Sequence, residues 1–138
     1  MVVEEKTLFE TSSVKFFEGP PIVEDLEAGE LGVNIDLFRQ IRDHYRKAKE
    51  NIPCRVLADI CQDIQPNGYI GRVDDSATRL STALTTVQRW RSRFAENGLL
   101  RRHNWNGRFS VDPKVAILID KDGKMVKPPK QGKGVFTF

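Results

Sequence analysis

The side chains best suited to recognise another molecule recur at helical spacing between residues 83 and 97. One helix face of this stretch, at positions i, i+3, i+4 and i+7, consists of Thr85, Gln88, Arg89 and Ser92. Arg93 lies at the margin of the same face. Arginine can donate two hydrogen bonds to guanine, glutamine can pair with adenine, and hydroxyl groups can bond to bases or phosphates. An ordinary solvated helix face is the alternative, but such a face usually mixes glutamate with lysine. This one has no acidic residue before Glu96, which favours base and phosphate recognition.

A second basic cluster follows in a segment that is predicted to be a β-hairpin. Two short strands, 99–103 and 108–111, flank Asn106-Gly107, the strongest short hairpin signal in the chain. The polar residues clustered on this hairpin are Arg101, Arg102, His103, Asn104, Asn106 and Arg108. A hairpin that presents arginine or asparagine can contact a sugar-phosphate backbone or a minor groove.

Charge is distributed unevenly along the chain. The 138 residues carry a formal net charge of +3, but residues 1–50 hold eleven acids and seven bases. Residues 51–138 hold eight acids and fifteen bases, and nine of these bases are arginines. Arginine pairs with phosphate in a bidentate geometry that lysine cannot match. The basic part of the chain therefore favours a polyanionic partner.

Hydrophobic periodicity and turn residues predict the elements that position these side chains. The predicted order is helix 34–49, helix 54–64, a strand over 69–73, a short helix capped by Asp74 or Asp75, a turn at Ser81-Thr82, helix 83–97 and the hairpin over 99–111. Either turn hydroxyl can cap helix 83–97, and Gly98 is typical of the residue that ends a helix. The inward-facing stripe of this helix consists of Ala83, Val87, Trp90 and Phe94. A weaker hairpin is predicted over 115–126.

This order of elements resembles that of winged helix-turn-helix DNA-binding proteins. The resemblance covers residues 54–117, and its most specific part is TALTTVQRWRSRFAENGLLRRHNWNGRFSVDP. More narrowly, the segment is similar to winged-helix transcription regulators and to the replication initiators of small plasmids and phages. The motifs that carry this likeness are Thr86-Val87, Glu96-Asn97-Gly98-Leu99 and Asp112-Pro113. Two positions depart from the pattern, because Ser81 stands where the turn usually has glycine and Arg91 where an aliphatic core residue is common.

The resemblance implies a mostly helical α+β fold, a winged helix-turn-helix with an extra N-terminal helix and arm. It implies a sequence-specific protein that binds double-stranded DNA and acts in transcription regulation, or in plasmid or phage replication or partition. Helix 83–97 would then read the major groove, and the wing over 99–111 would contact the backbone or the minor groove. The alternative is a winged-helix protein–protein adaptor that does not bind DNA.

The domain prediction places an acidic N-terminal arm at 1–33, the winged-helix domain at 34–127 and a C-terminal tail at 128–138. Residues 1–30 hold eight acids and two bases, a net charge of −6 that would repel phosphate. We expect the arm to have low intrinsic order, to pack on the domain or on a partner chain, and to include an edge strand over 13–17.

Helix 34–49 is predicted to start at Asn34 as its N-cap and to carry a dimer contact. Its apolar stripe includes Leu37, Phe38, Ile41 and Tyr45. This helix lies outside the winged-helix core, and two-fold proteins read two-fold operators. The sequence therefore predicts a homodimer through this stripe.

Other classes of function find no support in the sequence. No phosphate-binding loop, nucleophile elbow or spaced metal-ligand set is present, so we expect no enzyme activity, no cofactor, no metal and no small-molecule ligand. Cys54 and Cys61 share one helical stripe about 10 Å apart, too far for a disulfide, which predicts buried thiols. No apolar run reaches the roughly 20 residues that span a bilayer, and the first residues lack the basic and apolar regions typical of a signal peptide, so a cytoplasmic location is expected.

Overall fold

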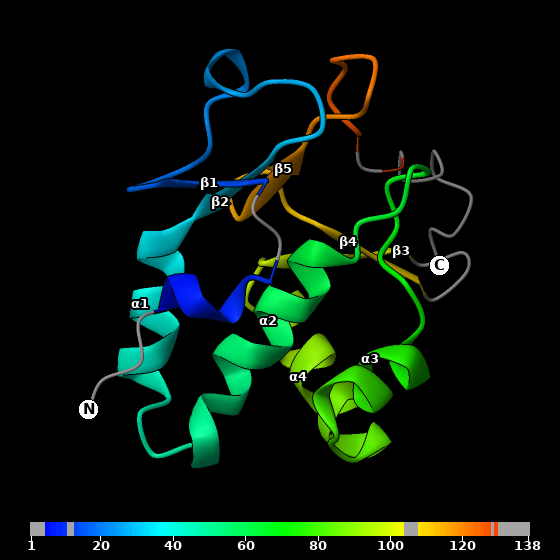
Figure 1. The fold of residues 1–138 in the computed structure, drawn as a ribbon. Helices are drawn as coiled ribbons and strands as arrows, with labels where there is room; N and C mark the ends of the chain where they lie inside the picture. Colours follow the sequence, from blue (N-terminus) through cyan, green and yellow to red (C-terminus); the bar gives the residue numbers. More distant parts are fainter. Residues whose placement is uncertain (1–4, 11–12, 104–107, 128, 130–138) are drawn as a thin grey trace.

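Four α-helices, two groups of β-strands and three short 3-10 helices make up the part of the chain that the structure describes (Figure 1). This computed structural model describes residues 5–10, 13–103, 108–127 and 129. In chain order the elements are η1 (Glu5–Leu8), β1 (Val14–Phe17), η2 (Val23–Asp25), β2 (Leu31–Asn34), α1 (Ile35–His44), η3 (Lys49–Asn51), α2 (Ile52–Gln62), α3 (Val73–Leu80), α4 (Leu84–Glu96), β3 (Leu100–His103), β4 (Arg108–Val111) and β5 (Ala116–Leu118). The predicted α+β class is confirmed.

A three-stranded sheet joins the start of the chain to a strand that follows the hairpin. β2 is the central strand, parallel to β1 and antiparallel to β5. In this register Leu31 pairs with Val14 on one side and with Leu118 on the other. The edge strand predicted over 13–17 is confirmed as β1.

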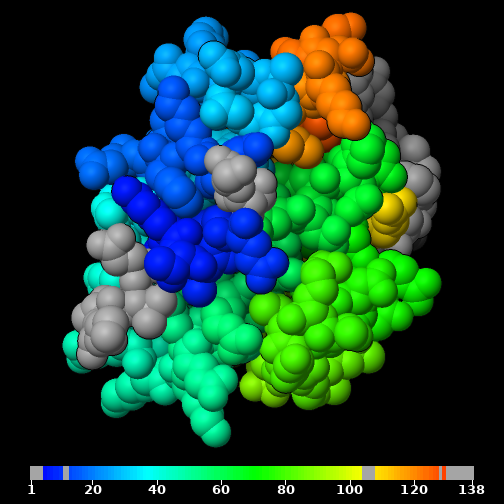
Figure 2. All heavy atoms as spheres, in the orientation of Figure 1, coloured from blue at the N-terminus to red at the C-terminus, as the bar shows by residue number. Residues whose placement is uncertain are grey.

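The arm predicted over residues 1–33 packs on the domain, one of the two arrangements expected for it, in the part of this segment that the structure describes. Leu31 and Val33 are buried, and Phe9 packs edge-on against Phe16 and Phe38 with ring centroids 5.5 and 5.4 Å apart. Figure 2 shows the 5–10 segment, in dark blue, seated directly on the body of the molecule. The pairing of β1 and β2 with β5 was not predicted, because β5 lies far away in the sequence.

Helix α1 begins as predicted, because the Asn34 side chain accepts a hydrogen bond from the Leu37 amide at 3.2 Å. It ends at His44 rather than at residue 49. Glu50 and Asn51 then adopt left-handed backbone conformations, with φ of 58° and 53°. This turn brings the chain directly into α2, which begins and ends two residues before the predicted helix 54–64.

The dimer contact predicted through α1 is wrong for Phe38 and Ile41, because both lie inside the core of the single chain. Phe38 is 0% exposed and Ile41 is 6% exposed. Leu37 and Tyr45 are half-buried and pack against the same core. The apolar stripe therefore exists as predicted, but α2 and η1 of the same chain cover it.

The two cysteines are buried thiols, as predicted. The Cys54 thiol donates to the Phe38 carbonyl oxygen at 3.3 Å, and burial raises its pKa to about 12. Burial, with the nearby Asp59 carboxylate, also raises the pKa of Cys61. Both groups therefore stay protonated at neutral pH and serve as core side chains.

Helices α2, α3 and α4 form a second packed group, which the β3–β4 hairpin completes (Figure 1). Val87, Trp90 and Phe94 are buried as predicted, whereas Ala83 is exposed. The predicted cap by a turn hydroxyl is wrong, since α4 follows Ala83 with no side-chain cap. Gly98 follows α4 with a φ of +78°, a conformation that glycine adopts without strain.

Two later predictions are met in part. The strand predicted over 69–73 is reduced to isolated bridges, in which Tyr69 pairs with Ser110 of β4 and Ile70 pairs with Ile64. The weaker hairpin over 115–126 contains β5 and a bridge between Ile119 and Met125.

We expect Phe38→Ala to lower the free energy of unfolding by about 3–5 kcal/mol, the usual loss for a buried phenylalanine. Urea denaturation measures this loss, and Leu37→Ala is the matched control because Leu37 is only half-buried on the same helix. A Phe38→Ala protein with wild-type stability and a changed oligomeric state in light scattering would restore the dimer interpretation.

Candidate nucleic-acid interface

The polar side chains predicted to recognise bases lie on the outer face of α4. Thr85, Gln88, Arg89 and Arg93 are exposed, and Ser92 is half-buried. The opposite face of the helix is buried against the core. Because the structure leaves this face uncovered by its described residues, its side chains are available to a partner.

A hydrogen bond connects this face of α4 to the hairpin. Arg102 on β3 donates from Nη2 to the Ser92 hydroxyl at 3.0 Å. The same guanidinium lies over the ring of Phe109 on β4, 5.1 Å from its centroid. Helix and hairpin are therefore held as one surface.

The other cations of the hairpin are also held by neighbours. Arg101 forms an ion pair with Asp112 at 3.3 Å, which offsets part of its charge. Arg108 stacks over the ring of Tyr69, 4.0 Å from its centroid. Asn104 and Asn106, predicted to contact DNA from the hairpin tip, lie outside the described residues.

Arg93 marks the far margin of the surface. Its guanidinium lies 5.1 Å from the centroid of Trp90 and 6.0 Å from that of Tyr45. It is therefore directed toward α1, away from the hairpin, while Gln88 and Ser92 face the hairpin side. The predicted residues thus occupy both edges of one exposed face.

His103, assigned to the basic cluster by its residue type, is buried instead. It is 0% exposed, and its Nε2 hydrogen-bonds with the Ser110 hydroxyl at 2.8 Å. Burial, together with the positive charges of Arg101 and Arg108, lowers the pKa of the imidazole. His103 is therefore neutral at pH 7 and contributes packing between β3 and β4, not charge.

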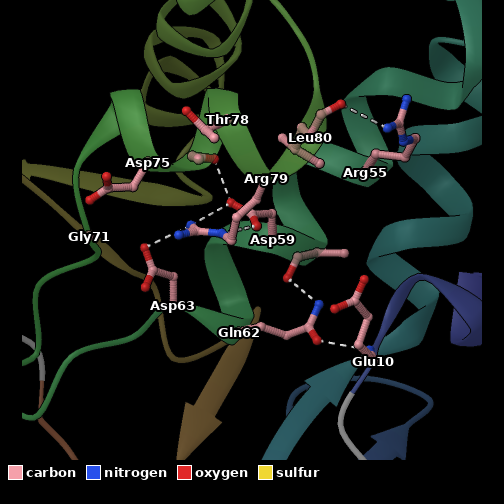
Figure 3. A network of polar contacts seen from close by, with 12 residues as sticks. Glu10, Arg55, Asp59, Gln62, Asp63, Gly71, Asp75, Thr78, Arg79 and Leu80 are labelled. Atoms are coloured by element: carbon pink, nitrogen blue, oxygen red, sulfur yellow. Dashed lines mark hydrogen bonds and ion pairs between the residues drawn. The ribbon is translucent and has the colours of Figure 1, made fainter.

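An ion-pair network that sequence reasoning missed positions α3 and hence α4. Figure 3 shows Arg79 of α3 reaching toward two carboxylates at the C-terminal end of α2. Its Nε donates to Asp59 at 2.8 Å and its Nη2 to Asp63 at 3.0 Å. The Ser76 hydroxyl donates to the same Asp59 carboxylate. These bonds raise the pKa of Arg79 and fix α3 on α2, because all four residues lie on or next to those two helices.

The backbone at residue 71 approaches this network closely. A Cβ atom on Gly71 would lie 2.1 Å from Asp63 Oδ2, so any other residue here would force the Asp63 carboxylate to move. The same residue offers its carbonyl oxygen to Arg91 of α4. Gly71 therefore connects the Asp63 network to the inner side of α4.

A groove of about 940 Å³ lies between α4, the start of α3 and the hairpin. The charged side chains that line it are Asp63, Arg72, Asp75, Arg91, Arg102 and Arg108. Gln88 and Ser92, two of the predicted recognition residues, also line it, so the groove opens onto the candidate interface. We find this groove only in the structure, because its walls come from four separate segments.

Arg91 is the residue of the groove that packing does not explain. It is 5% exposed, and its Nη1 donates to the Gly71 carbonyl oxygen at 2.9 Å. Its Nε and Nη2 have no hydrogen-bond partner among the described residues. Burial lowers its pKa. A buried donor without a partner costs about 1–3 kcal/mol, and more when it is charged.

The chain matches no family model, no curated protein and no solved structure. Among the described residues, no cluster of three or more His, Cys, Asp or Glu side chains is placed to hold a metal ion. None of the described helices combines the length and the apolar character needed to cross a membrane. The function of the interface therefore has to be argued from its own geometry.

The lowered pKa of His103 predicts a loss of stability in mild acid. Unfolding restores an ordinary imidazole pKa near about 6.5, so below that pH the unfolded chain binds a proton that the folded chain resists. The contribution of His103 to the free energy of unfolding should be fully present above this pH. It should fall, by at most about 1.4 kcal/mol per pH unit, as the pH drops toward 5.5. Thermal unfolding between pH 7.5 and 5.5 measures the slope.

The two histidines of the chain provide a matched comparison for this slope. His103→Phe should flatten it, whereas His44→Gln should keep it because His44 is exposed. An unchanged slope in His103→Phe would show that the buried imidazole does not titrate in this range.

Proposed function

We propose that this chain binds double-stranded DNA, with α4 in the major groove and the β3–β4 hairpin on the backbone or in the minor groove. Sequence-specific recognition would come from Thr85, Gln88, Arg89, Ser92 and Arg93. The cellular role proposed from the resemblance is transcription regulation, or plasmid or phage replication or partition. A protein–protein adaptor is the outcome that the experiment below must distinguish from DNA binding.

The order and pairing of the elements support this proposal. Three helices, α2, α3 and α4, precede the hairpin, and the segment before α3 bridges to β4 through Tyr69 and Ser110. A winged helix-turn-helix has this order, with the third helix as its recognition helix. Ser81 in the turn between α3 and α4 has a φ of 51°, the left-handed conformation for which glycine is the usual residue.

The observation that carries the proposal is the bond between Arg102 and Ser92. It joins an exposed helix face without acids before Glu96 to a hairpin whose described cations are Arg101, Arg102 and Arg108. A major groove about 12 Å wide admits one α-helix. With α4 in that groove, the hairpin fixed beside α4 would lie next to the sugar-phosphate backbone.

The position of the acidic segment agrees with this orientation. Its exposed acids include Glu18, Glu24, Asp25 and Glu27, which lie in the connections around β1 and β2. In Figure 1 these connections stand at the opposite end of the molecule from α3 and α4. A duplex on α4 would therefore lie away from the strongest negative charge of the chain.

A homodimer remains a prediction, and its contact cannot use Phe38 or Ile41 in the folded chain. Leu37 and Tyr45 are half-buried, so they offer little apolar area to a partner. Light scattering on the wild-type protein, with and without duplex, measures the stoichiometry.

Substitutions on the two elements should affect binding differently. Arg89→Ala should reduce binding to a selected duplex by roughly 1–3 kcal/mol and binding to random DNA far less, because base contacts discriminate between sequences. Arg102→Ala and Arg108→Ala should weaken both and reduce the salt slope by about one unit per lost phosphate contact. Binding curves on both duplexes at several salt concentrations measure this, after selection from a random library.

Lys121→Ala is the control for a lost positive charge, because Lys121 is exposed in the turn after β5, far from α4 (Figure 1). It should leave both affinities unchanged. Arg89→Ala could instead lower the affinity for selected and random DNA equally, while the hairpin variants lose affinity only for the selected duplex. That result would show that the hairpin reads the bases and α4 contacts the backbone. A wild-type protein without salt-dependent affinity for duplex DNA would favour the adaptor.

A further inference from the structure

The groove beside α4 is lined by a buried arginine whose hydrogen-bond donors are only partly satisfied by the described residues. Arg91 is more than nine-tenths buried, lines the groove, and uses one of its donors on the Gly71 carbonyl oxygen. Its Nε and Nη2 lack partners among the described residues. An aliphatic side chain would fill this inward position of α4 without that penalty, so the arginine requires an explanation other than stability.

The charged side chains that line the groove, taken together, favour an anion. Arg72, Arg102 and Arg108 also line the groove, against two carboxylates. One of these, Asp63, is already held by Arg79 and by the Gln65 side chain, at 3.0 and 2.8 Å. The other, Asp75, is exposed at the start of α3. The lining is therefore cationic on balance.

The remaining lining has the composition of a site for a phosphorylated molecule. Gln88 and Ser92 offer an amide and a hydroxyl, and Phe109 offers an apolar ring. A volume of about 940 Å³ falls within the range of pockets that bind small molecules, roughly 300–1,000 Å³. Guanidinium groups bind phosphate with two parallel hydrogen bonds, which is the capacity that Arg91 leaves unused.

We propose that this groove binds a phosphate ester, with Arg91 as the residue that selects it. The phosphate belongs either to the backbone of a bound duplex or to a free nucleotide, since the same chemistry recognises both. The first source rests on the proposed function and deepens it. The second goes beyond it, because a free nucleotide in the groove would occupy the space between α4 and the hairpin and compete with DNA.

The test compares wild type with Arg91→Met, which keeps a long side chain and removes the charge. Isothermal titration with inorganic phosphate and with adenosine 5′-monophosphate at low salt measures the free ligands. Duplex binding across a salt series measures the backbone contact. If the ligand is a free phosphate ester, Arg91→Met should bind it at least tenfold more weakly than wild type. If the ligand is the DNA backbone, the salt slope of duplex binding should fall by about one unit in Arg91→Met. Its melting temperature should stay the same or rise, because a buried charge has been removed.

Three further variants separate charge from fold. Arg91→Lys keeps the charge but cannot form two parallel bonds, so it should bind less tightly than wild type. Asp75→Asn should bind phosphate more tightly, because it removes a negative charge from the groove without altering the core. Arg46→Met, in the exposed turn after α1, is the charge-matched control and should change nothing.

The outcomes are distinct. Nucleotide binding lost in Arg91→Met with an unchanged duplex slope identifies a free phosphorylated ligand, and a reduced slope without nucleotide binding identifies the DNA backbone. Unchanged binding of every probe in Arg91→Met overturns the proposal, and a lower melting temperature in the same variant would make Arg91 structural. If wild type fails to bind DNA, the proposed function falls, while the titrations with phosphate and nucleotide still decide this inference.

Discussion

The guanidinium of Arg79, held between Asp59 and Asp63, determines where the α3–α4 pair stands on α2. Asp59 and Asp63 are partly shielded from water, with 12% and 19% of their side chains exposed, so the attraction is screened less than between fully exposed groups. α3 buries Ser76 and Ala77 and packs Val73 and Leu80 partly against the core. The ion pairs add directional contacts to this packing. Through the left-handed turn at Ser81, the orientation of α3 passes to α4 and its exposed face.

The same region contains charges that weaken the fold. Asp63 approaches Gly71 so closely that a side chain at position 71 would displace its carboxylate, and Gly71 in turn gives Arg91 its hydrogen-bond acceptor. A guanidinium with two unsatisfied donors opposes stability, whereas Val87 and Phe94 on the same helix are packed at 0% exposure. Such a local conflict within a well-packed core is typical of a site kept for binding, because function is the usual reason for retaining a destabilising group.

Sequence reasoning found what local patterns encode and missed what distant partners decide. The Asn34 cap, the inward stripe of α4, the hairpin strands and the Gly98 terminus are each set by neighbours within one turn. The apolar stripe on α1 correctly predicted that this face of the helix would be buried. Periodicity could not show whether another element of the same chain, such as η1, or a second chain would bury it. The β1–β2–β5 sheet escaped prediction because its third strand is remote. His103 was assigned to the basic cluster by its residue type, which implies exposure, although tertiary packing buries it. Arg91 was recognised as a departure at a core position, but only the structure shows its unpartnered donors among the described residues.

The acidic beginning of the chain is fixed in place, which changes how its charge can act. Glu5 pairs with Arg42 of α1, and Gln62 of α2 bonds to the Leu8 carbonyl oxygen and the Glu10 amide at 3.2 and 2.9 Å. A segment anchored in this way cannot sweep across α4 as a flexible competitor. Its charge acts instead as one end of a fixed dipole, with the arginines of α4 and the hairpin at the other. Within a Debye length of about 8–10 Å, a polyanion would attract the basic end and repel the acidic one, so the proposed duplex would be met with α4 facing it.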